Sequence, residues 1–445
     1  MSTRPPPPPG PHLILGLARS GQAAALTLRR RGEEVIGVDA GAPDVQALVA
    51  AGVEVHLRSD GVAQVARARA LVKSPGVPAH APALAGARRA GVPVLGELEL
   101  AWRLLDNPFI AVTGTNGKTT VSELLGHIHR EAGVAVAVAG NVGTPLSSLV
   151  DALSPQAVVV CEASSFQLED TIAFAPEAAV MLNLSEDHLD RHGSVEAYRD
   201  AKRQAFVRQA NDDLAVYPCD LGIDLGGCAR RVCFGVGPDA GVSARAGQLW
   251  WEDQALLAVS DLRLRGAHNL HNAMAAAAVA LARGIEPDAV RVALSTFAGV
   301  SHRLEEVALQ DDVLYVNDSK ATNVASTLVA LASFAPDTVC LILGGQGKGQ
   351  DFTALAEAVA ERARRVYLIG EDAPVIAAAL APLPTRVTQC GDLERALTDA
   401  RRDARPGDVV LLSPACASFD QFRDFEERGE RFRELAQRLA LRPAP

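Results

Sequence analysis

An apolar stretch, a glycine-containing loop with one lysine and a helix-forming stretch follow one another in residues 108–130, PFIAVTGTNGKTTVSELLGHIHR. The apolar stretch is typical of a buried parallel strand, and the residues after Lys118 have the spacing of an amphipathic helix. Gly114 and Gly117 let backbone amides turn inward, while the helix N-terminus and Lys118 add positive charge. The segment therefore predicts an α/β fold with a phosphate-binding loop at the end of one strand.

This loop is a variant of the Walker pattern, because Val112 occupies the position of the first glycine of the strict motif. A hydroxyl directly after the lysine, from Thr119 or Thr120, can hold a magnesium ion. The residues predicted to bind the nucleotide are Gly114, Thr115, Asn116, Gly117, Lys118, Thr119 and Thr120.

Apolar runs alternate with helical stretches along the whole chain, which is the pattern of parallel sheets flanked by helices. The predicted strands are HLILG from His12, EVIGVD from Glu34, FIAVTG from Phe109, AVVVCE from Ala157, AAVMLN from Ala178, TVCLILGG from Thr338, VYLIG from Val366 and DVVLLSP from Asp408. A chain of 445 residues is too long for one core. We place domain boundaries near Leu98 and Val300, which gives domains 1–98, 99–300 and 301–445.

Composition excludes several classes of protein. Hydrophobic residues make up 48% of the chain, and the net charge of -10 argues against a nucleic-acid partner or an anionic membrane surface. No apolar run reaches the roughly 18 residues of a spanning helix, and no secretory signal is recognisable, so we expect a cytoplasmic protein without membrane insertion. The run Pro5–Pro9 predicts a loose polyproline II tail. Seven scattered cysteines without a CxxC pair indicate neither a disulfide framework nor a zinc site.

The first block has part of the pattern of a dinucleotide-binding unit. A glycine loop at residues 16–21 is followed by a helical stretch and a strand that ends at Asp39. Ala18 replaces the second glycine, which favours another nucleotide or a nucleotide sugar over NAD. A later loop, KSPGVP at residues 73–78, contains Ser74; its pattern alone favours a simple turn.

Acidic residues and a histidine follow two strands of the central block. Glu162 ends one strand, and Asp187, His188 and Asp190 come shortly after the next. Ligands of open α/β sheets bind beyond the carboxyl ends of the strands, where these side chains could meet a hard cation or a phosphate. Glu162 is the predicted magnesium ligand; the alternative is a carboxylate that caps the next helix together with the serines after it.

Lys202 lies in the helical stretch VEAYRDAKRQAF, between Arg199 and Arg203. The crowding of three positive charges should make Lys202 easier to deprotonate, and a neutral amine is the form that reacts with carbon dioxide. The alternative is a solvated basic face of a helix.

Two asparagines and an arginine are candidate nucleotide contacts. Asn269 and Asn272 fall on one side of the first turn of a helix, where their amides could bind a purine edge, and helix capping explains only one of them. Arg303 lies at the second predicted boundary and could reach a phosphate; an ordinary salt bridge is the alternative.

Three polar loops follow strands in the last block. Their lysines, hydroxyls and backbone amides would suit a small dicarboxylate. The loop residues are Asp318, Ser319, Lys320 and Thr322 in YVNDSKATN, Lys348 in LGGQGKGQDF, and Ser413 and Ser418 in LLSPACASFDQF.

Taken in order, these motifs resemble those of the Mur ligases over nearly the whole chain: TGTNGKTT, GNVGTPL, EASSFQLE, NLSEDHLDRHGS, YRDAKRQAF, HNLHN, SHRLE, NDSKATN and SPACASFDQF. The resemblance implies an N-terminal Rossmann-like domain, a central P-loop ATPase-like domain with a parallel or mixed sheet, and a C-terminal Rossmann-like domain. DSKATN is most similar to the members that add D-glutamate to UDP-N-acetylmuramoyl-L-alanine. The implied activity is ATP-dependent amide synthesis through an acyl phosphate in cytoplasmic peptidoglycan assembly, and we expect a monomer.

The resemblance also implies a role for each matched residue. The catalytic residues are Lys118, His188 and Lys202, and the metal ligands for two Mg²⁺ ions are Thr119, Glu162, His188 and Lys202, the last as a carbamylated lysine. The ATP contacts outside the loop are Asn272, Arg303 and Asp318. The D-glutamate pocket contains Lys320, Thr322, Lys348, Ser418 and the backbone of Phe425, and the muramoyl substrate faces Asn141, Ser164 and His188.

The first block departs from the family pattern at Ala18 and at Gly41, where a basic residue near the uracil is expected. Arg19, Ser20 and Ser74 are therefore the predicted contacts of the UDP group. Because the ATP contacts come from the central and last blocks, these domains should close over ATP. The alternatives are another Mur ligase, an amide ligase similar to folylpolyglutamate synthetase, and a nucleotide-gated binding protein without turnover.

Overall fold

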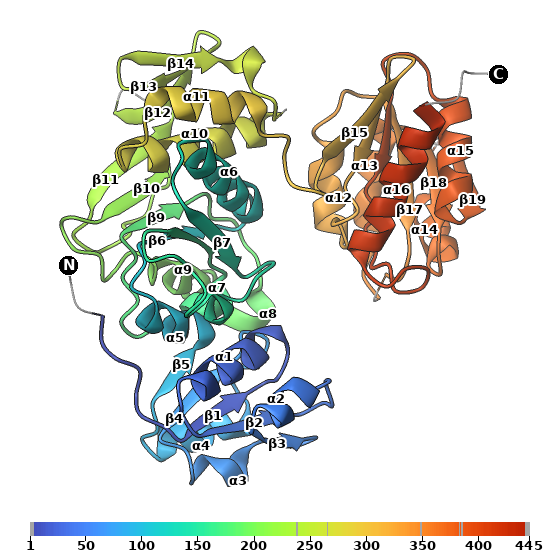
Figure 1. Cartoon of the computed structure of the whole chain (residues 1–445). Helices are drawn as coiled ribbons and strands as arrows, with labels where there is room; N and C mark the ends of the chain where they lie inside the picture. The colour runs from blue at the N-terminus through green and yellow to red at the C-terminus, as the bar shows by residue number, and fades with distance from the viewer. Residues whose placement is uncertain are drawn as a thin grey trace. The chain divides into compact units, whose positions relative to one another are not determined.

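The computed structural model describes residues 4–236, 239–264, 266–347, 349–381, 383 and 386–440 (Figure 1). Its chain divides into two compact units. The first contains the chain up to Arg263 together with His268–Phe297, and the second contains Leu264–Ala267 and the chain from Ala298 onward. The first unit holds two sheets, so we distinguish a first lobe (residues 4–96) from a central lobe (residues 97–263 and 268–297).

A five-stranded parallel sheet in the order β3-β2-β1-β4-β5 forms the first lobe (Figure 1). Successive residues of β1 (His12–Leu15) point to opposite faces: Leu13 packs with α4 (Pro82–Arg89) and Ile14 with α1 (Arg19–Arg30). Burial on both faces explains why the strand is an unbroken apolar run. The other elements are β2 (Val35–Asp39), α2 (Gln46–Ala50), β3 (Glu54–Leu57), α3 (Val62–Val65), β4 (Ala70–Lys73) and β5 (Val94–Gly96).

The central lobe contains a nine-stranded mixed sheet in the order β14-β13-β12-β11-β10-β9-β6-β8-β7. Its fully buried strand β6 (Phe109–Thr113) lies between β8 (Val158–Glu162) and β9 (Ala178–Met181), and α6 (Lys118–Glu131) follows it. The predicted phosphate-binding loop is therefore at the carboxyl end of an inner strand. Other elements include α5 (Glu97–Leu104), β7 (Val136–Gly140), η1 (Leu146–Leu149), α7 (Ser165–Leu168), α8 (Leu189–His192), α9 (Val195–Arg203), β10 (Leu214–Pro218), β11 (Arg230–Gly235), β12 (Ala240–Arg245), β13 (Gln248–Trp251), β14 (Gln254–Ala258), η2 (Val259–Asp261), α10 (Ala267–Ala282) and α11 (Pro287–Thr296).

The second unit contains a six-stranded sheet in the order β15-β16-β20-β17-β18-β19, in which only β15 is antiparallel to its neighbour. One face packs against α12, α13 and α14, and the other packs against α15 and α16. Its elements are β15 (Glu305–Gln310), β16 (Val313–Asn317), α12 (Val324–Leu331), β17 (Val339–Gly344), η3 (Thr353–Leu355), α13 (Ala356–Arg362), β18 (Ala363–Ile369), α14 (Ala373–Leu380), β19 (Arg386–Gly391), α15 (Leu393–Asp403), β20 (Val409–Leu412) and α16 (Phe425–Ala440).

Every strand predicted from an apolar run is present: β1, β2, β6, β8, β9, β17, β18 and β20. The domain boundaries near Leu98 and Val300 stay predictions. Within the described residues, no helix is both long and apolar enough to cross a lipid bilayer.

The N-terminal segment is fastened to the central lobe, so the prediction of a loose tail was wrong. The Arg4 guanidinium donates to the carbonyl oxygens of Trp102 (3.0 Å), Leu105 and Asn107 (2.8 Å) and pairs with Glu177 (2.8 Å). It also lies 4.9 Å from the centroid of the Trp102 ring. Arg4 satisfies carbonyl groups at the end of α5, and this contact holds the proline run in place.

Cys219 and Cys233 form a disulfide, which the scattered cysteines did not predict. Cys219 directly follows β10, and Cys233 lies within the paired strand β11, where it is opposite Tyr217. Their Cα atoms are 4.9 Å apart, within the range that a disulfide can bridge. Strand pairing thus brings together two cysteines that are 14 residues apart in sequence.

Candidate active site

The predicted phosphate-binding loop connects β6 to α6. Gly114 and Gly117 have φ angles of 150° and 85°, and a Cβ atom at Gly114 would lie 2.9 Å from the Cβ of Leu182. Lys118 begins α6, and its Nζ donates to the carbonyl oxygens of Gly114 (2.9 Å) and Thr115 (2.8 Å). The ammonium group therefore lies beside the turn that would hold the phosphates.

Asn272 packs directly against this loop. A Cβ atom at Gly117 would collide with the Asn272 amide, so glycine is required there for packing as well as for its φ angle. Asn272 also donates to Asn269 (3.4 Å), one helical turn earlier in α10. The two asparagines predicted as nucleotide contacts thus lie on one side of a helix, and Asn272 is next to the loop.

Glu162 lies at the carboxyl end of β8, beside Val112 of β6. Its side chain is buried and accepts a hydrogen bond from the Asn141 amide (3.0 Å), and it forms no ion pair with any described residue. A buried carboxylate with only a neutral partner can hold a cation. Together with the buried Thr119 hydroxyl in the first turn of α6, this donor set fits Mg²⁺.

His188 is exposed and has a positive φ of 52°. Its ring lies 4.7 Å from the Phe166 ring, centroid to centroid, and its Nε2 is 3.5 Å from an Asp187 carboxylate oxygen. Among the described residues, no three histidine, cysteine or acidic side chains are grouped as a ready metal centre. A metal role for His188 therefore stays a prediction, and the side chain of Asp190 lies outside the described set.

Lys202 is buried at 1% exposure, so the alternative of a solvated basic face is excluded. Its Nζ donates to the carbonyl oxygen of Gly114 (2.7 Å) and lies 4.6 Å from the centroid of the Tyr198 ring. Burial, and then the nearby Lys118 charge, lower the pKa of Lys202 to about 6. The predicted direction is confirmed, but the predicted cause was wrong because Arg203 points away to Asp200 (3.0 Å).

The predicted contacts of the UDP group lie at the carboxyl edge of the first-lobe sheet. Ser74 is buried and donates to the carbonyl oxygen of Gly16 (2.7 Å), while Arg19 reaches the carbonyl oxygen of Gly143 (2.7 Å) in the central lobe. Ser20 is in the first turn of α1. The Asp39 carboxylate binds the backbone amide of Leu17 (2.6 Å), so it shapes the loop at residues 16–21.

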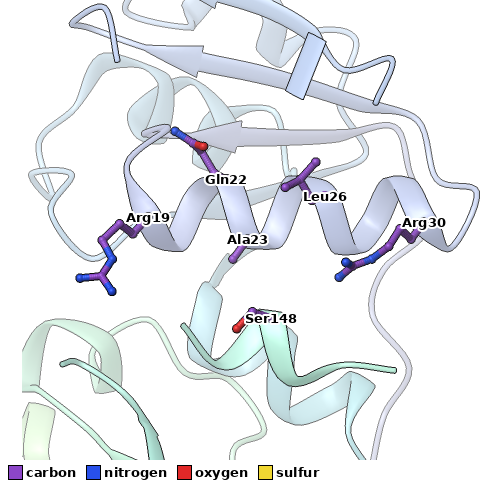
Figure 2. A pocket seen from close by; sticks show the side chains of 6 residues that line it. All are labelled: Arg19, Gln22, Ala23, Leu26, Arg30 and Ser148. Carbon is purple, nitrogen blue, oxygen red and sulfur yellow. The ribbon is translucent and has the colours of Figure 1, made fainter. Parts of the chain in front are cut away.

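A small pocket lies between α1 and η1, with Arg19 at one end and Arg30 at the other (Figure 2). Ala23 faces Ser148 across it in this view. Arg19 is the only predicted site residue in its lining, so this pocket lies beside the predicted substrate site.

Asn141 and Ser164, the predicted muramoyl contacts, both have partners within the protein. Asn141 binds Glu162, as described above. Ser164 is the N-cap of α7, where it accepts from the Gln167 amide (3.3 Å) in a capping box. Capping, which was weighed as an alternative at this position, is thus the observed local role of Ser164, and substrate contact stays a prediction.

In the second unit, the predicted residues gather at the adjoining ends of β16, β20 and β17. Asp318 accepts from the Ser413 hydroxyl (2.8 Å) and the Leu304 amide (3.2 Å). Burial raises the pKa of Asp318 to about 7, opposed by these hydrogen bonds and by the Arg303 charge. Arg303 and Asp318 are therefore near each other, as expected for residues that contact one ligand.

The predicted D-glutamate residues are on the same loops. Lys320 lies with its Nζ 5.8 Å from the centroid of the Phe425 ring. Thr322 follows it within the turn after β16, where its amide donates to the Lys320 carbonyl (2.9 Å), and Ser418 is buried after β20. Lys348 lies outside the described residues.

Sequence reasoning missed Arg428, which organises these loops. Its guanidinium donates to the hydroxyl (2.9 Å) and carbonyl (2.7 Å) of Ser319 and to the carbonyl of Cys416 (3.1 Å). Arg428 falls on the same face of α16 as the buried Phe432 and Leu435. An arginine at an apolar position of a helix was the available signal.

Comparison with known proteins bears on these predictions. Residues 112–280 match the Mur ligase middle domain, and residues 302–416 match the glutamate ligase domain of Mur ligases. A relative from Pelotomaculum thermopropionicum named UDP-N-acetylmuramoylalanine--D-glutamate ligase is 42% identical, with 96% of this chain and 97% of the relative covered. A Salinibacter ruber protein of the same name is 43% identical, with the same shares covered.

The chain belongs to the Mur ligase family. The predicted family and enzyme class are confirmed. Solved Mur ligases share the fold: UDP-N-acetylmuramate-alanine ligase MurC from Thermotoga maritima has a TM-score of 0.60 at 20% identity, covering 96% of this chain and 99% of that one. MurF from Acinetobacter baumannii has a TM-score of 0.57 at 17% identity, covering 96% and 93%. The predicted α/β fold class is thus confirmed.

Proposed function

We propose that this Mur ligase joins D-glutamate to UDP-N-acetylmuramoyl-L-alanine at the expense of ATP. The observation that carries the proposal is the convergence of Lys118 and Lys202 on the Gly114 carbonyl, with Glu162 at the neighbouring strand end. Its full-length relatives bear the name of that activity.

The chemistry requires two anions to approach each other. The carboxylate of the muramoyl substrate attacks the γ-phosphate of ATP, the bond to the β-phosphate oxygen breaks, and ADP departs, which leaves an acyl phosphate. The D-glutamate amine, in its neutral form, then attacks the acyl carbon; phosphate leaves, and the amide nitrogen loses its extra proton to solvent. Lys118 and the loop amides neutralise charge on the transferred phosphoryl group and orient it for in-line transfer. Magnesium, when bound, neutralises further charge on the phosphate oxygens.

Thr119 and Glu162 would hold one magnesium ion, and His188 with a carbamylated Lys202 would hold the second. The neutral amine of Lys202 is the nucleophile that carbon dioxide requires, and burial next to Lys118 keeps a large fraction of it neutral at pH 7. In the second unit, Arg303 and Asp318 would contact the nucleotide, and Lys320, Thr322, Lys348, Ser418 and Phe425 would bind D-glutamate.

Arg19, Ser20 and Ser74 would contact the UDP group, and Asn141 and Ser164 the muramoyl group. We place the reaction in the cytoplasm and propose a monomer that binds small molecules only. The acidic net charge of -10 supports this, because a nucleic-acid surface would need surplus lysine and arginine.

A phosphate-release assay tests the substrate assignment. Purified protein is given ATP, Mg²⁺ and UDP-N-acetylmuramoyl-L-alanine, with D-glutamate, L-alanine or a diamino acid as the amine. We expect release only with D-glutamate. Preference for another amino acid would make the chain a different amide ligase, and ATP binding without release under any condition would support a binding protein without turnover.

A further inference from the structure

A cluster of four charged side chains, centred on the buried Lys73, joins the two lobes of the first unit. Lys73, the last residue of β4, is 1% exposed, and its Nζ lies 2.5 Å from an Asp170 oxygen and 3.2 Å from a Glu169 oxygen. Both acids follow α7 in the central lobe. Arg191 of α8 donates to Glu169 (2.6 Å) and completes the cluster. Two basic and two acidic groups balance each other, which is how buried charges are tolerated.

Each member of this cluster adjoins a loop with a predicted substrate contact. Lys73 precedes Ser74, and the two acids follow α7, which Ser164 caps. Arg191 lies in the helix after His188 and also donates to the carbonyl oxygen of Pro75 (2.9 Å), so it binds the KSPGVP loop directly. The cluster therefore links three substrate loops from two lobes.

The two lobes of the first unit are packed closely against each other at this junction. The Gly96 amide donates to the Asp170 carbonyl (3.2 Å), and a Cβ atom at Gly96 would lie 3.0 Å from the Asp170 Cβ. Arg191 is also held at its other face, since its guanidinium lies 3.9 Å from the centroid of the Phe166 ring. The spacing of the loops thus depends on the ion pairs and on close backbone packing together.

We propose that Lys73 is a positioning residue for the UDP-muramoyl substrate. Through Asp170 and Glu169, it sets the distance between the Ser74 loop of the first lobe and the Ser164 and His188 loops of the central lobe. This inference rests on the proposed function, because it is that reaction which brings one substrate against all three loops. The phosphate-binding loop has no member of the cluster, so ATP binding should be independent of it.

Substitution of Lys73 tests the proposal by separating the two substrates. In Lys73→Met, the KM for UDP-N-acetylmuramoyl-L-alanine should rise about tenfold, because a shift of the loops by a fraction of an ångström is enough to weaken binding. The KM for ATP should stay within about twofold. Lys73→Arg, which keeps the charge, should recover at least half of the lost affinity.

Arg4→Met is the matched control. Arg4 is also a largely covered cation, with 10% of its side chain exposed, that pairs with an acid of the central lobe, but its partners are Glu177 and carbonyl groups near α5, away from the substrate loops. Arg4→Met should lower the thermal stability of the protein without changing the KM for the muramoyl substrate. An equal rise in that KM in Arg4→Met would show that general weakening of the unit is the cause, and would overturn the proposal.

Asp170→Asn gives a milder variant should Lys73→Met fail to fold. It should raise the same KM, and the double variant Lys73→Arg/Asp170→Asn should raise it no further than Asp170→Asn alone, because the pair acts as a unit. Unchanged KM values in folded Lys73→Met or in Asp170→Asn would overturn the proposal.

Amide hydrogen exchange supplies a readout that does not need turnover. Exchange at residues 74–77 and 164–168 should accelerate in Lys73→Met and in Asp170→Asn but not in Arg4→Met. If the wild-type protein releases no phosphate with any amine, the proposed function fails while this measurement still tests the cluster. If the wild type is active and exchange is unchanged in the variants, the inference alone fails.

Discussion

Two lysines of the first unit are equally buried, at 1% exposure, yet their surroundings are opposite. Lys73 donates to two carboxylates, those of Glu169 and Asp170. Lys202 donates to a carbonyl oxygen, and the nearby charge of Lys118 opposes its protonation. Both lysines are thus buried to the same extent, and they differ in the charge of the groups around the amine.

Where acids surround the amine, the ammonium is compensated and serves packing and orientation. Where a carbonyl and a second cation surround it, the neutral form is favoured and the amine can react. The pKa of Lys202, lowered to about 6, places this residue in the second class. In the proposed active site, Lys202 would therefore be a residue whose surroundings disfavour its charged form and reduce stability.

The largest effect is expected when Lys118, the cation next to Lys202, is removed. In Lys118→Ala, amide formation should fall about 10³-fold, because the charge that stabilises the transferred phosphoryl group is lost. The pKa of Lys202 should rise at the same time, since one of the two causes that lower it is removed. Phosphate release measures the first effect and NMR titration of the lysine amine measures the second; full activity would refute the role of Lys118. Circular dichroism should show the same fold as the wild type.

The second test compares the stability of methionine variants at both lysines. Lys73→Met should lower the free energy of unfolding by about 3 kcal/mol, because it leaves the largely buried Asp170 carboxylate without its counter-charge, while Glu169 keeps Arg191. Lys202→Met should cause no loss at pH 7, since it removes an amine that the fold keeps neutral and the unfolded chain protonates. Urea denaturation in buffer freed of carbon dioxide measures both. Similar losses of unfolding free energy in Lys73→Met and Lys202→Met would contradict the difference between the two lysines.

The lowered pKa of Lys202 also determines how the stability of the fold changes with pH. The folded pKa of Lys202 is about 6, whereas the ordinary lysine pKa is 10.5, so the unfolded chain binds more protons than the folded chain between these pH values. The contribution of Lys202 to stability should therefore rise as the pH increases above about 6, and Lys202→Met should lose this slope.

The third test addresses modification of Lys202. Lys202→Ala should lower kcat about 10- to 100-fold, the range found when a residue that supports a metal site is lost. With ¹³C-labelled bicarbonate, the wild type should give a carbamate carbon signal that Lys202→Arg lacks. An electron-density map that shows an unmodified amine at pH 8 in bicarbonate would contradict the carbamate, whereas the lowered pKa would stand.

The strands from apolar runs and the glycine-containing turn between β6 and α6 could be predicted from sequence because their signals are local. An apolar run between glycine-rich loops, such as residues 109–113, carries its own evidence of burial. Strands β3, β5, β7, β10–β15 and β19 were not predicted. Short strands with mixed polarity, such as EVHL at residues 54–57, resemble loops.

Roles that depend on contacts distant in sequence could not be predicted. No residue near Lys73 in the sequence indicates that Lys73 will pair with Asp170. The pKa of Lys202 is lowered by burial and then by the charge of Lys118, not by the adjacent arginines. At Ser164, the structure shows a helix cap, and the predicted substrate contact stays a prediction. Local residue patterns predict elements, whereas charge partners are determined by the assembled fold.

The smallest predicted effect concerns Asp318 in the second unit. Asp318 is a buried acid whose hydrogen-bond donors, the Ser413 hydroxyl and the Leu304 amide, are neutral. Its pKa is raised to about 7, so it changes from mostly protonated at pH 6 to mostly ionised at pH 8. Because the folded state binds the extra proton, the stability contributed by Asp318 falls as the pH rises from about 4 towards 7. If the carboxylate accepts a hydrogen bond from the nucleotide, the KM for ATP should be several-fold lower at pH 8 than at pH 6. Asp318→Asn should abolish this dependence, and a variant that kept the same pH profile would place the titrating group elsewhere.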